Sequence, residues 1–242
     1  MDEIIMRTSR AMASHPRLRM LALLAQGEHT PTQLAKTLRL PLYGVSQHLH
    51  ILFTASLITR RRSGAMNYCR MGSPYRVTTF SGKLVAWLGS LLNTPSTPEK
   101  KHSGLAQVRD VPAETAEVLH RTIFEAATAF TDLRRLQLLR YLARRQGADA
   151  QEVGAVLSMS PQAISRHVRK LVRRGYVQTH RLGHRVVYSS SPTFKTPIHR
   201  RLREIIEAAW AQRQASAFMV DSRRSPGRKS KGTARSGETA QK

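Results

Sequence analysis

Cysteine is nearly absent from this chain, which has a single thiol, Cys69, in 242 residues. One thiol excludes an intramolecular disulfide and any zinc site built from several cysteines, and it suits a reducing compartment. Acidic side chains are also scarce, with 15 Asp and Glu residues against 40 Lys and Arg. Metal-dependent nucleases need clustered carboxylates to hold Mg²⁺, so this scarcity argues against that class of enzyme.

Long hydrophobic runs are missing as well. No apolar stretch approaches the ~18 residues that a bilayer-spanning helix needs. The first ten residues, MDEIIMRTSR, begin acidic and lack the apolar region of a signal peptide. We therefore expect a cytoplasmic protein with no membrane partner. Aromatic residues make up only 6% of the chain, and no aromatic stacking sheet of the kind that binds RNA is evident.

Positive charge is what the chain has in excess. The net charge is +25 and the pI is about 11.6, and both halves of the chain are basic. A protein this basic needs a polyanionic partner, and nucleic acid is the commonest. We find no nucleophile–base pair, phosphate-cradling glycine loop or paired carboxylates in the sequence. The expectation is a nucleic-acid-binding protein that is not an enzyme and needs no cofactor or metal.

An internal repeat is the most informative pattern. The stretch VSQHL from Val45 recurs as ISRHV from Ile164, an offset of 119 residues. Further along, Gly64 of SLITRRRSGAMNYC corresponds to Gly183 of GYVQTHRLGHRVVY. Upstream, HPRLRMLALLAQ and LRRLQLLRYLAR both place leucines at helical spacing. The sequence therefore predicts two copies of one module.

Start and stop signals predict short helices joined by tight turns in each copy. Thr30 and Gln33 form a capping box with proline at the first helical position, and Asp149 and Glu152 form a second box. Each helix stops after about eight residues, where a proline opens the next. In each copy two short strands follow, joined by a turn at a glycine. We expect them at Leu57–Arg62 and Met66–Arg70 in the first copy and at Tyr176–Arg181 and Arg185–Ser190 in the second. Helix, helix-turn-helix and hairpin is the order of a winged helix.

The predicted fold is mainly α with small β-hairpin wings, as two tandem winged helix-turn-helix domains with flanking packing helices. The first domain covers 1–94 and the second 113–220. Between them, 95–112 is rich in proline, serine, threonine and charge and is interpreted as a linker. The segment 221–242 has almost no apolar residues and is expected to be a disordered basic tail. The flanking helices are predicted at Asp2–Ala13, Val77–Asn93, Ala113–Phe130 and Pro197–Phe218.

Both halves resemble the winged-helix domain of the arsenical-resistance repressor (ArsR-type) family. The resemblance rests on HPRLRMLALLA, QLAKTLRLPLYGVSQHLHIL and RRRSGAMNY in the first copy and on DLRRLQLLRYLA, PQAISRHVRKLVRRGYV and RLGHRVVY in the second. It implies a bacterial, homodimeric repressor that a metal ion or another signal releases from DNA. This chain departs from the family because it carries two modules, and because its Thr30–Leu38 and Asp149–Leu157 helices lack the cysteines of a thiolate metal site. Metal sensing is therefore not expected.

A recognition helix lies in the major groove with its apolar stripe toward the module core. The predicted buried stripes are Val45, Leu49 and Leu52 in the first copy and Ile164, Val168 and Leu171 in the second. The outward residues expected to contact DNA are Tyr43, Ser46, Gln47 and His50 in the first copy and Gln162, Ser165, Arg166 and Arg169 in the second. Gln pairs with adenine and Arg with guanine, so the second helix should favour guanine more than the first. The plainer interpretation is a solvated helix face.

The hairpins add a second group of candidate contacts. Those predicted to follow phosphates or enter the minor groove are Arg60, Arg61 and Arg62 in the first wing and Arg181, His184 and Arg185 in the second. The structural alternative is that these charged residues prevent exposed strand edges from pairing with other chains, as they do in proteins that bind no partner. Arg173 and Arg174 fit solvated surface equally well.

Five further residues have a structural and a functional interpretation. His48 and His167 lie beside the buried stripes, where packing or donation to a phosphate is favoured over metal binding. Cys69 is expected to be semi-buried in a wing strand, with redox sensing as the alternative. The two tryptophans, Trp87 and Trp210, are expected in the core of an interface.

The predicted function is a sequence-specific transcription regulator that binds double-stranded DNA, is expected to repress, and is located at the nucleoid in the cytoplasm. The flanking helices are expected to make one polypeptide an intra-chain pseudo-dimer, with further homodimerisation left open. The residues expected at that junction are Ile123, Phe124, Phe130, Ile205, Ile206 and Trp210. A replication initiator or a nucleoid-architecture protein is the alternative, because tandem winged helices serve those roles too.

Overall fold

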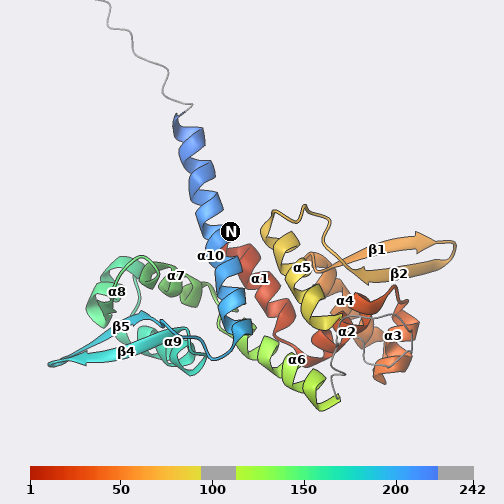
Figure 1. Cartoon of the computed structure of the whole chain (residues 1–242), viewed down its shortest axis with the longest axis horizontal. Coiled ribbons are helices and arrows are strands. Elements are labelled where there is room, and N and C mark those ends of the chain that lie inside the picture. Colours follow the sequence, from red (N-terminus) through yellow and green to blue (C-terminus); the bar gives the residue numbers. More distant parts are fainter. Residues whose placement is uncertain (94–112, 223–242) are drawn as a thin grey trace, which may run out of the picture.

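The computed structural model describes residues 1–93 and 113–222, with two hairpins at opposite ends of a helical body (Figure 1). The first stretch forms α1 (Asp2–Met12), α2 (His15–Gln26), α3 (Pro31–Leu38), α4 (Leu42–Thr54), β1 (Ile58–Ser63), β2 (Met66–Met71) and α5 (Phe80–Leu92). The second forms α6 (Ala113–Thr128), α7 (Leu133–Leu142), β3 (Ala148–Asp149), α8 (Ala150–Leu157), α9 (Pro161–Arg173), β4 (Val177–Leu182), β5 (Arg185–Ser190) and α10 (Pro197–Ser222). The predicted fold class, mainly α with small hairpin wings, is confirmed.

The helix starts follow the predicted capping chemistry. Thr30 accepts a hydrogen bond from the Gln33 amide and its own amide donates to the Gln33 side chain, which completes the box at α3. Asp149 and Glu152 form the same reciprocal pair at α8. These bonds satisfy amides that have no partner within the first turn of a helix. The beginnings of the two short helices are therefore fixed by local sequence.

Positive backbone φ angles recur at the same places in both stretches. Among the described residues, every residue with positive φ belongs to one of three pairs that are 119 positions apart, namely Arg39 and Ser158, Ser56 and Gly175, and Gly64 and Gly183. The first pair turns the chain between the two helices of each helix-turn-helix, the second follows α4 and α9, and the third turns each hairpin. Because non-glycine residues adopt positive φ only at a cost, the recurrence at Arg39 and Ser158 reflects the same tight turn in both stretches.

Each hairpin is an antiparallel pair of six-residue strands. β1 pairs with β2 from Ile58 opposite Met71 to the turn, and β4 pairs with β5 from Val177 opposite Ser190. β1 and β4 are shifted by one residue at both ends from the predicted bounds, β2 ends one residue later, and β5 matches its prediction. The short β3, which was not predicted, adds a third strand in the order β3-β5-β4. In the first stretch a single bridge between His29 and Cys69 occupies the corresponding place.

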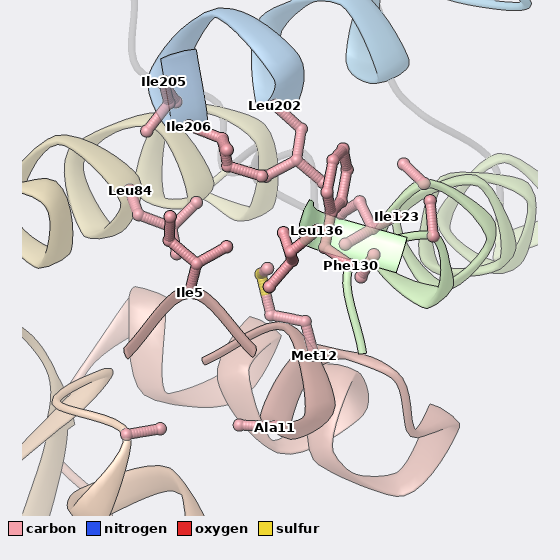
Figure 2. Packing of buried hydrophobic residues seen from close by; sticks show 14 of the residues in the cluster. Ile5, Ala11, Met12, Leu84, Ile123, Phe130, Leu136, Leu202, Ile205 and Ile206 are labelled. Atoms are coloured by element: carbon pink, nitrogen blue, oxygen red, sulfur yellow. The ribbon is translucent and has the colours of Figure 1, made fainter. Parts of the chain in front are cut away.

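The helices that flank the winged elements share one hydrophobic core (Figure 2). Ile5 and Met12 of α1 lie near Leu84 of α5, Ile123 of α6 and Leu136 of α7, and the face of α10 that includes Leu202, Ile205 and Ile206 covers this group. The residues predicted at the junction are buried, except Phe124, which is half-buried and stacks on His15 of α2 at 4.6 Å. The two halves of the chain therefore pack against each other through apolar side chains.

Polar contacts also join the two halves. The indole Nε1 of Trp210 donates to Asp2 Oδ1 at 2.8 Å, and Arg10 Nε donates to the Thr131 carbonyl at 2.9 Å. Trp210 is buried, as predicted for the core of an interface, whereas Trp87 is only half-buried against the core. These contacts connect residues more than a hundred positions apart.

Several predicted helix ends differ from the structure by one or two residues, and two differ by more. α5 begins at Phe80 instead of Val77, because the Thr79 hydroxyl caps the helix by accepting from the Gly82 amide, and Val77 is 70% exposed before it. α10 continues through Asp221 to Ser222, two residues into the segment predicted to be disordered. The linker predicted at 95–112 and the rest of that tail lie outside the described residues. None of the described helices has the length and apolar character that a membrane span requires.

Candidate nucleic-acid interface

The helix α4 has the predicted division into a buried and an exposed face. Val45, Leu49 and Leu52 are buried against the first hydrophobic core. All four predicted contact residues are exposed, namely Tyr43, Ser46, Gln47 and His50. With 3.6 residues per turn, Tyr43, Gln47, His50 and Thr54 form one row along the outside of the helix, and this row contains no lysine or arginine.

The helix α9 has the same division with a different exposed surface. Ile164, Val168 and Leu171 are buried, and the four predicted contact residues, Gln162, Ser165, Arg166 and Arg169, are exposed. The corresponding outer row is Gln162, Arg166, Arg169 and Arg173. Three arginines in one row make the exposed face of α9 strongly basic, whereas its buried face is apolar.

An open cleft of about 600 Å³ lies between the α9 basic face and the turn before α7. It is lined by Thr128, Thr131, Asp132, Arg135, Arg166, His167, Arg169, Lys170 and Arg173. Burial lowers the pKa of Lys170, and the neighbouring Arg174, Arg173 and Arg135 lower it further. Crowded cations of this kind are relieved by a bound anion, and a phosphate backbone supplies one.

Sequence reasoning missed part of this cleft. For Arg173 the sequence fits solvated surface as well as a contact, and it predicts no role for Lys170 or Arg135. The signal for Arg173 was present, because it continues the row of Arg166 and Arg169 at a spacing of four residues. Arg135 could not be found this way, because it reaches the cleft from α7. Its guanidinium also donates to the Ala129 carbonyl at 3.0 Å and the Thr131 hydroxyl at 2.7 Å, which fixes the turn between α6 and α7.

The three arginines of the first wing have different surroundings. The Arg60 guanidinium lies 4.4 Å from the centre of the Phe53 ring. Arg61 forms an ion pair with Glu28, with Nη2 and Oε2 2.7 Å apart. This hydrogen bond holds the pKa of Glu28 below and that of Arg61 above the ordinary value. Arg62 is exposed, and its Nε donates to the Gly64 carbonyl at 3.3 Å. Of the three, Arg61 is the one already neutralised by a carboxylate.

The second wing combines basic and apolar residues. Arg181, His184 and Arg185 are all exposed around the Gly183 turn. Arg185 Nη1 lies 3.5 Å from Asp149 Oδ2, a weak ion pair with the cap of α8. Leu182 beside the turn is 66% exposed. The side chains at this hairpin tip are therefore accessible for contact with a groove or a surface.

Of the two equivalent histidines in α4 and α9, His48 is half-buried and His167 is buried. His167 is 7% exposed, and its Nδ1 lies 3.8 Å from Asp132 Oδ1. Burial lowers the pKa of His167, which Asp132 only partly opposes, and burial lowers the pKa of His48 as well. Both imidazoles are therefore mainly neutral at pH 7 and pack beside the helix core. Among the side chains that the structure describes, no three from His, Cys, Asp or Glu are grouped so that they could hold a metal ion.

Cys69 is more buried than predicted, at 2% exposed. Its amide and carbonyl each bond to His29 at 2.9 Å, so that β2 is tied to the segment before α3. Burial raises the pKa of the Cys69 thiol, an effect that the nearby Arg60 opposes. A buried thiol with a raised pKa reacts slowly with oxidants, so the packing role explains this residue.

Comparison with known families supports the interpretation of the second half. Residues 131–185 match the model of the MarR family, and this stretch contains α7, β3, α8, α9 and β4. The match covers less than half of the chain. It agrees with the order of helix, helix-turn-helix and hairpin, and it points to a winged helix-turn-helix regulator of transcription that binds DNA. No curated protein matches the chain.

Solved structures of two other proteins match parts of the chain. HlyU from Vibrio cholerae N16961 is 26% identical over 34% of this chain, with a TM-score of 0.28, and covers 84% of its own length, or 81% in the reduced form. The AntR antimony-specific transcriptional repressor is 24% identical over 46% of this chain and 92% of its own, with a TM-score of 0.32.

Proposed function

We propose that this chain is a sequence-specific transcription regulator that binds double-stranded DNA through two non-identical recognition helices, α4 and α9. The observation that carries the proposal is the α9 surface. A row of three arginines lies on the exposed side of a helix that follows a tight turn, beside a basic cleft and a basic wing. Helices of this kind enter the major groove while the surrounding cations neutralise phosphates.

The arrangement of the two helices supports one operator bound by one chain. α4 and α9 are the equivalent helices of the repeat, and they are connected through the packed helices α1, α5, α6 and α10. In this proposal the chain is an intra-chain pseudo-dimer of two winged helix-turn-helix domains, 1–94 and 113–220, and each helix reads one half-site. Centres about 34 Å apart would place both half-sites on one face of the duplex.

The finer assignments rest on the sequence resemblance. An ArsR-like bacterial repressor in the cytoplasm is the version that we propose. A replication initiator or nucleoid-architecture protein would present the same surfaces, and the pattern of sites on the genome separates them. A few promoter sites indicate a regulator, repeated sites at an origin indicate an initiator, and diffuse coverage indicates an architectural protein.

Binding measurements with two single variants test the proposal. Arg166→Ala should cost about 1–3 kcal/mol of binding free energy on a selected site and relax preference at one base pair, because a bidentate contact with guanine is lost. Arg62→Ala should weaken binding to selected and scrambled sites alike and reduce the slope of log affinity against log salt by about one. Both are read from one titration series at several salt concentrations.

The Arg62→Ala variant is the matched control, since it removes the same charge from an exposed position on a wing. Equal losses on both DNA sites for Arg166→Ala would mean that Arg166 holds phosphate. A chain that prefers no sequence over any other would contradict the proposed function itself.

A further inference from the structure

The two equivalent helices differ in the chemistry of their exposed faces. α4 contains no lysine or arginine, whereas the last eight residues of α9 contain four such side chains. The first turn of α4 exposes two large apolar groups instead: Tyr43 is 75% exposed and Leu42 is 49% exposed. At the corresponding positions, 119 residues later, α9 has Gln162 and Pro161.

These apolar groups lie where a recognition helix meets the bases. Tyr43 begins the outer row that continues through Gln47 and His50, and it occupies the place that Gln162 occupies on α9. The N-terminal half of a recognition helix is the part that faces base edges in the major groove. In that groove the only apolar group on a base edge is the 5-methyl group of thymine, and adenine offers the donor and acceptor pair that a glutamine side chain matches.

We propose that α4 reads a half-site rich in A·T pairs, with Leu42 and Tyr43 in contact with thymine methyl groups and Gln47 bonded to an adenine. This inference rests on the proposed function, which it deepens by naming the bases. α9, with Arg166 and Arg169 on its outer row, reads the half-site that contains guanine. The two half-sites of the operator therefore differ in sequence, and α4 recognises its half-site mainly through uncharged side chains.

The proposal predicts an unusual pattern of salt dependence. Removal of a methyl contact takes away apolar burial, which is worth about a fourfold change in affinity per methyl group. It releases no counterions, so the slope of log affinity against log salt stays the same. Loss of an arginine that contacts phosphate changes both the affinity and the slope of log affinity against log salt.

The test begins with selection of bound sites by the full chain from a random duplex library. Repetition with Arg166→Ala identifies the α9 half as the one whose preference relaxes, so the other half belongs to α4. Thymine is then replaced by uracil in each half in turn, which removes the methyl group and keeps the base pair. We expect uracil in the α4 half to lower affinity about fourfold per contacted methyl, at an unchanged salt slope, and uracil in the α9 half to have a smaller effect.

A double variant and a matched control complete the design. In Leu42→Ala with Tyr43→Ala, uracil in the α4 half should no longer matter, whereas Tyr43→Phe should keep the full sensitivity because the ring is retained. Both residues are exposed, so these variants should fold, and circular dichroism checks that they do.

Three results would overturn the inference while sparing the proposed function: a G·C-rich α4 half, no effect of uracil in that half, or equal uracil effects in wild type and the double variant. If the double variant binds every site as the wild type does, the apolar face contacts something other than DNA. Failure of the selection to enrich any sequence would reject the proposed function and this inference together.

Discussion

Arg61 and Arg62 are adjacent in β1 and carry the same charge, yet their surroundings differ. Arg61 is held by Glu28 in a two-point contact, with Nε and Oε1 3.3 Å apart and Nη2 and Oε2 2.7 Å apart. Arg62 has only a carbonyl as its partner. An arginine whose charge is already matched by a carboxylate gains less from a phosphate, because the carboxylate must be displaced or remain close to the DNA.

The first prediction at this scale concerns Glu28→Gln. The substitution keeps the side-chain shape, removes one negative charge beside the wing and frees Arg61 for the duplex. Affinity should rise on selected and scrambled sites alike, and the slope of log affinity against log salt should steepen by about one. The free energy of unfolding should hardly change, because an exposed ion pair contributes little to stability.

Arg61→Ala combined with Glu28→Gln is the control for this prediction. The double variant lacks the freed guanidinium, so most of the gain should disappear. If Glu28→Gln leaves the salt slope unchanged, Arg61 does not reach a phosphate and the first wing contacts DNA through other residues.

The sequence was a good guide to which side chains point inward and which outward. The 3.6-residue period assigned the buried stripes of α4 and α9 correctly, and every predicted contact residue is exposed. It could not show which cations are already paired. Glu28 and Arg61 are 33 positions apart and meet only because β2 draws the hairpin toward the segment before α3. Arg135 and Lys170 likewise come from separate helices, α7 and α9, and only the fold brings them to one cleft.

At the scale of elements, the local rules predicted most helix starts and failed at one. Capping boxes fixed α3 and α8, and glycines fixed both hairpin turns. The beginning of α5 was placed three residues early because apolar periodicity extends through Val77, while Thr79 caps the helix. β3 has only two residues and exists because β5 lies next to it, so no local pattern could have predicted it.

Two glycines of α5 give a prediction at this scale. A Cβ added at Gly89 would meet nothing within 4 Å, whereas a Cβ at Gly82 would lie 2.7 Å from Val77 Cα and closer still to the Arg76 carbonyl oxygen. Gly89→Ala should raise the free energy of unfolding by about 0.5–1 kcal/mol, because alanine loses less backbone entropy in a helix. Gly82→Ala should lower it by about 1–3 kcal/mol, because the capping segment must move.

Chemical denaturation of the two variants measures both effects, and each serves as the control for the other since the chemical change is identical. If both variants changed the free energy of unfolding equally and in the same direction, the close packing of the 76–79 segment against α5 would not explain the effect of a side chain at position 82. Gly89→Ala is also a useful background for the binding experiments, because Gly89 lies away from α4 and α9 along the chain.

At the scale of the whole molecule, the arrangement of helices decides how the two halves behave. α1 comes from the start of the chain and α10 from its end, yet Trp210 bonds to Asp2, and the apolar face of α10 covers side chains from α1, α5 and α6 (Figure 2). This packing was predicted because, in the family that both halves resemble, the helices flanking the winged helix form the dimer interface. Which helix pairs with which was not predictable, since amphipathic helices of similar composition fit one another in several ways.

The last prediction follows from this shared core: the chain should unfold in one cooperative transition. Two independent domains would unfold separately, and a substitution in one would leave the transition of the other unchanged. Ile206→Ala in the shared core and Leu34→Ala in α3 should each cost about 2–5 kcal/mol, because both side chains are fully buried. Differential scanning calorimetry of the full chain and both variants should therefore show one peak that moves to lower temperature in each case. Two peaks, with Leu34→Ala moving only the first, would mean that the junction does not couple the two halves. The two recognition helices would then be held at no fixed spacing, and a fixed separation between the half-sites would no longer be expected.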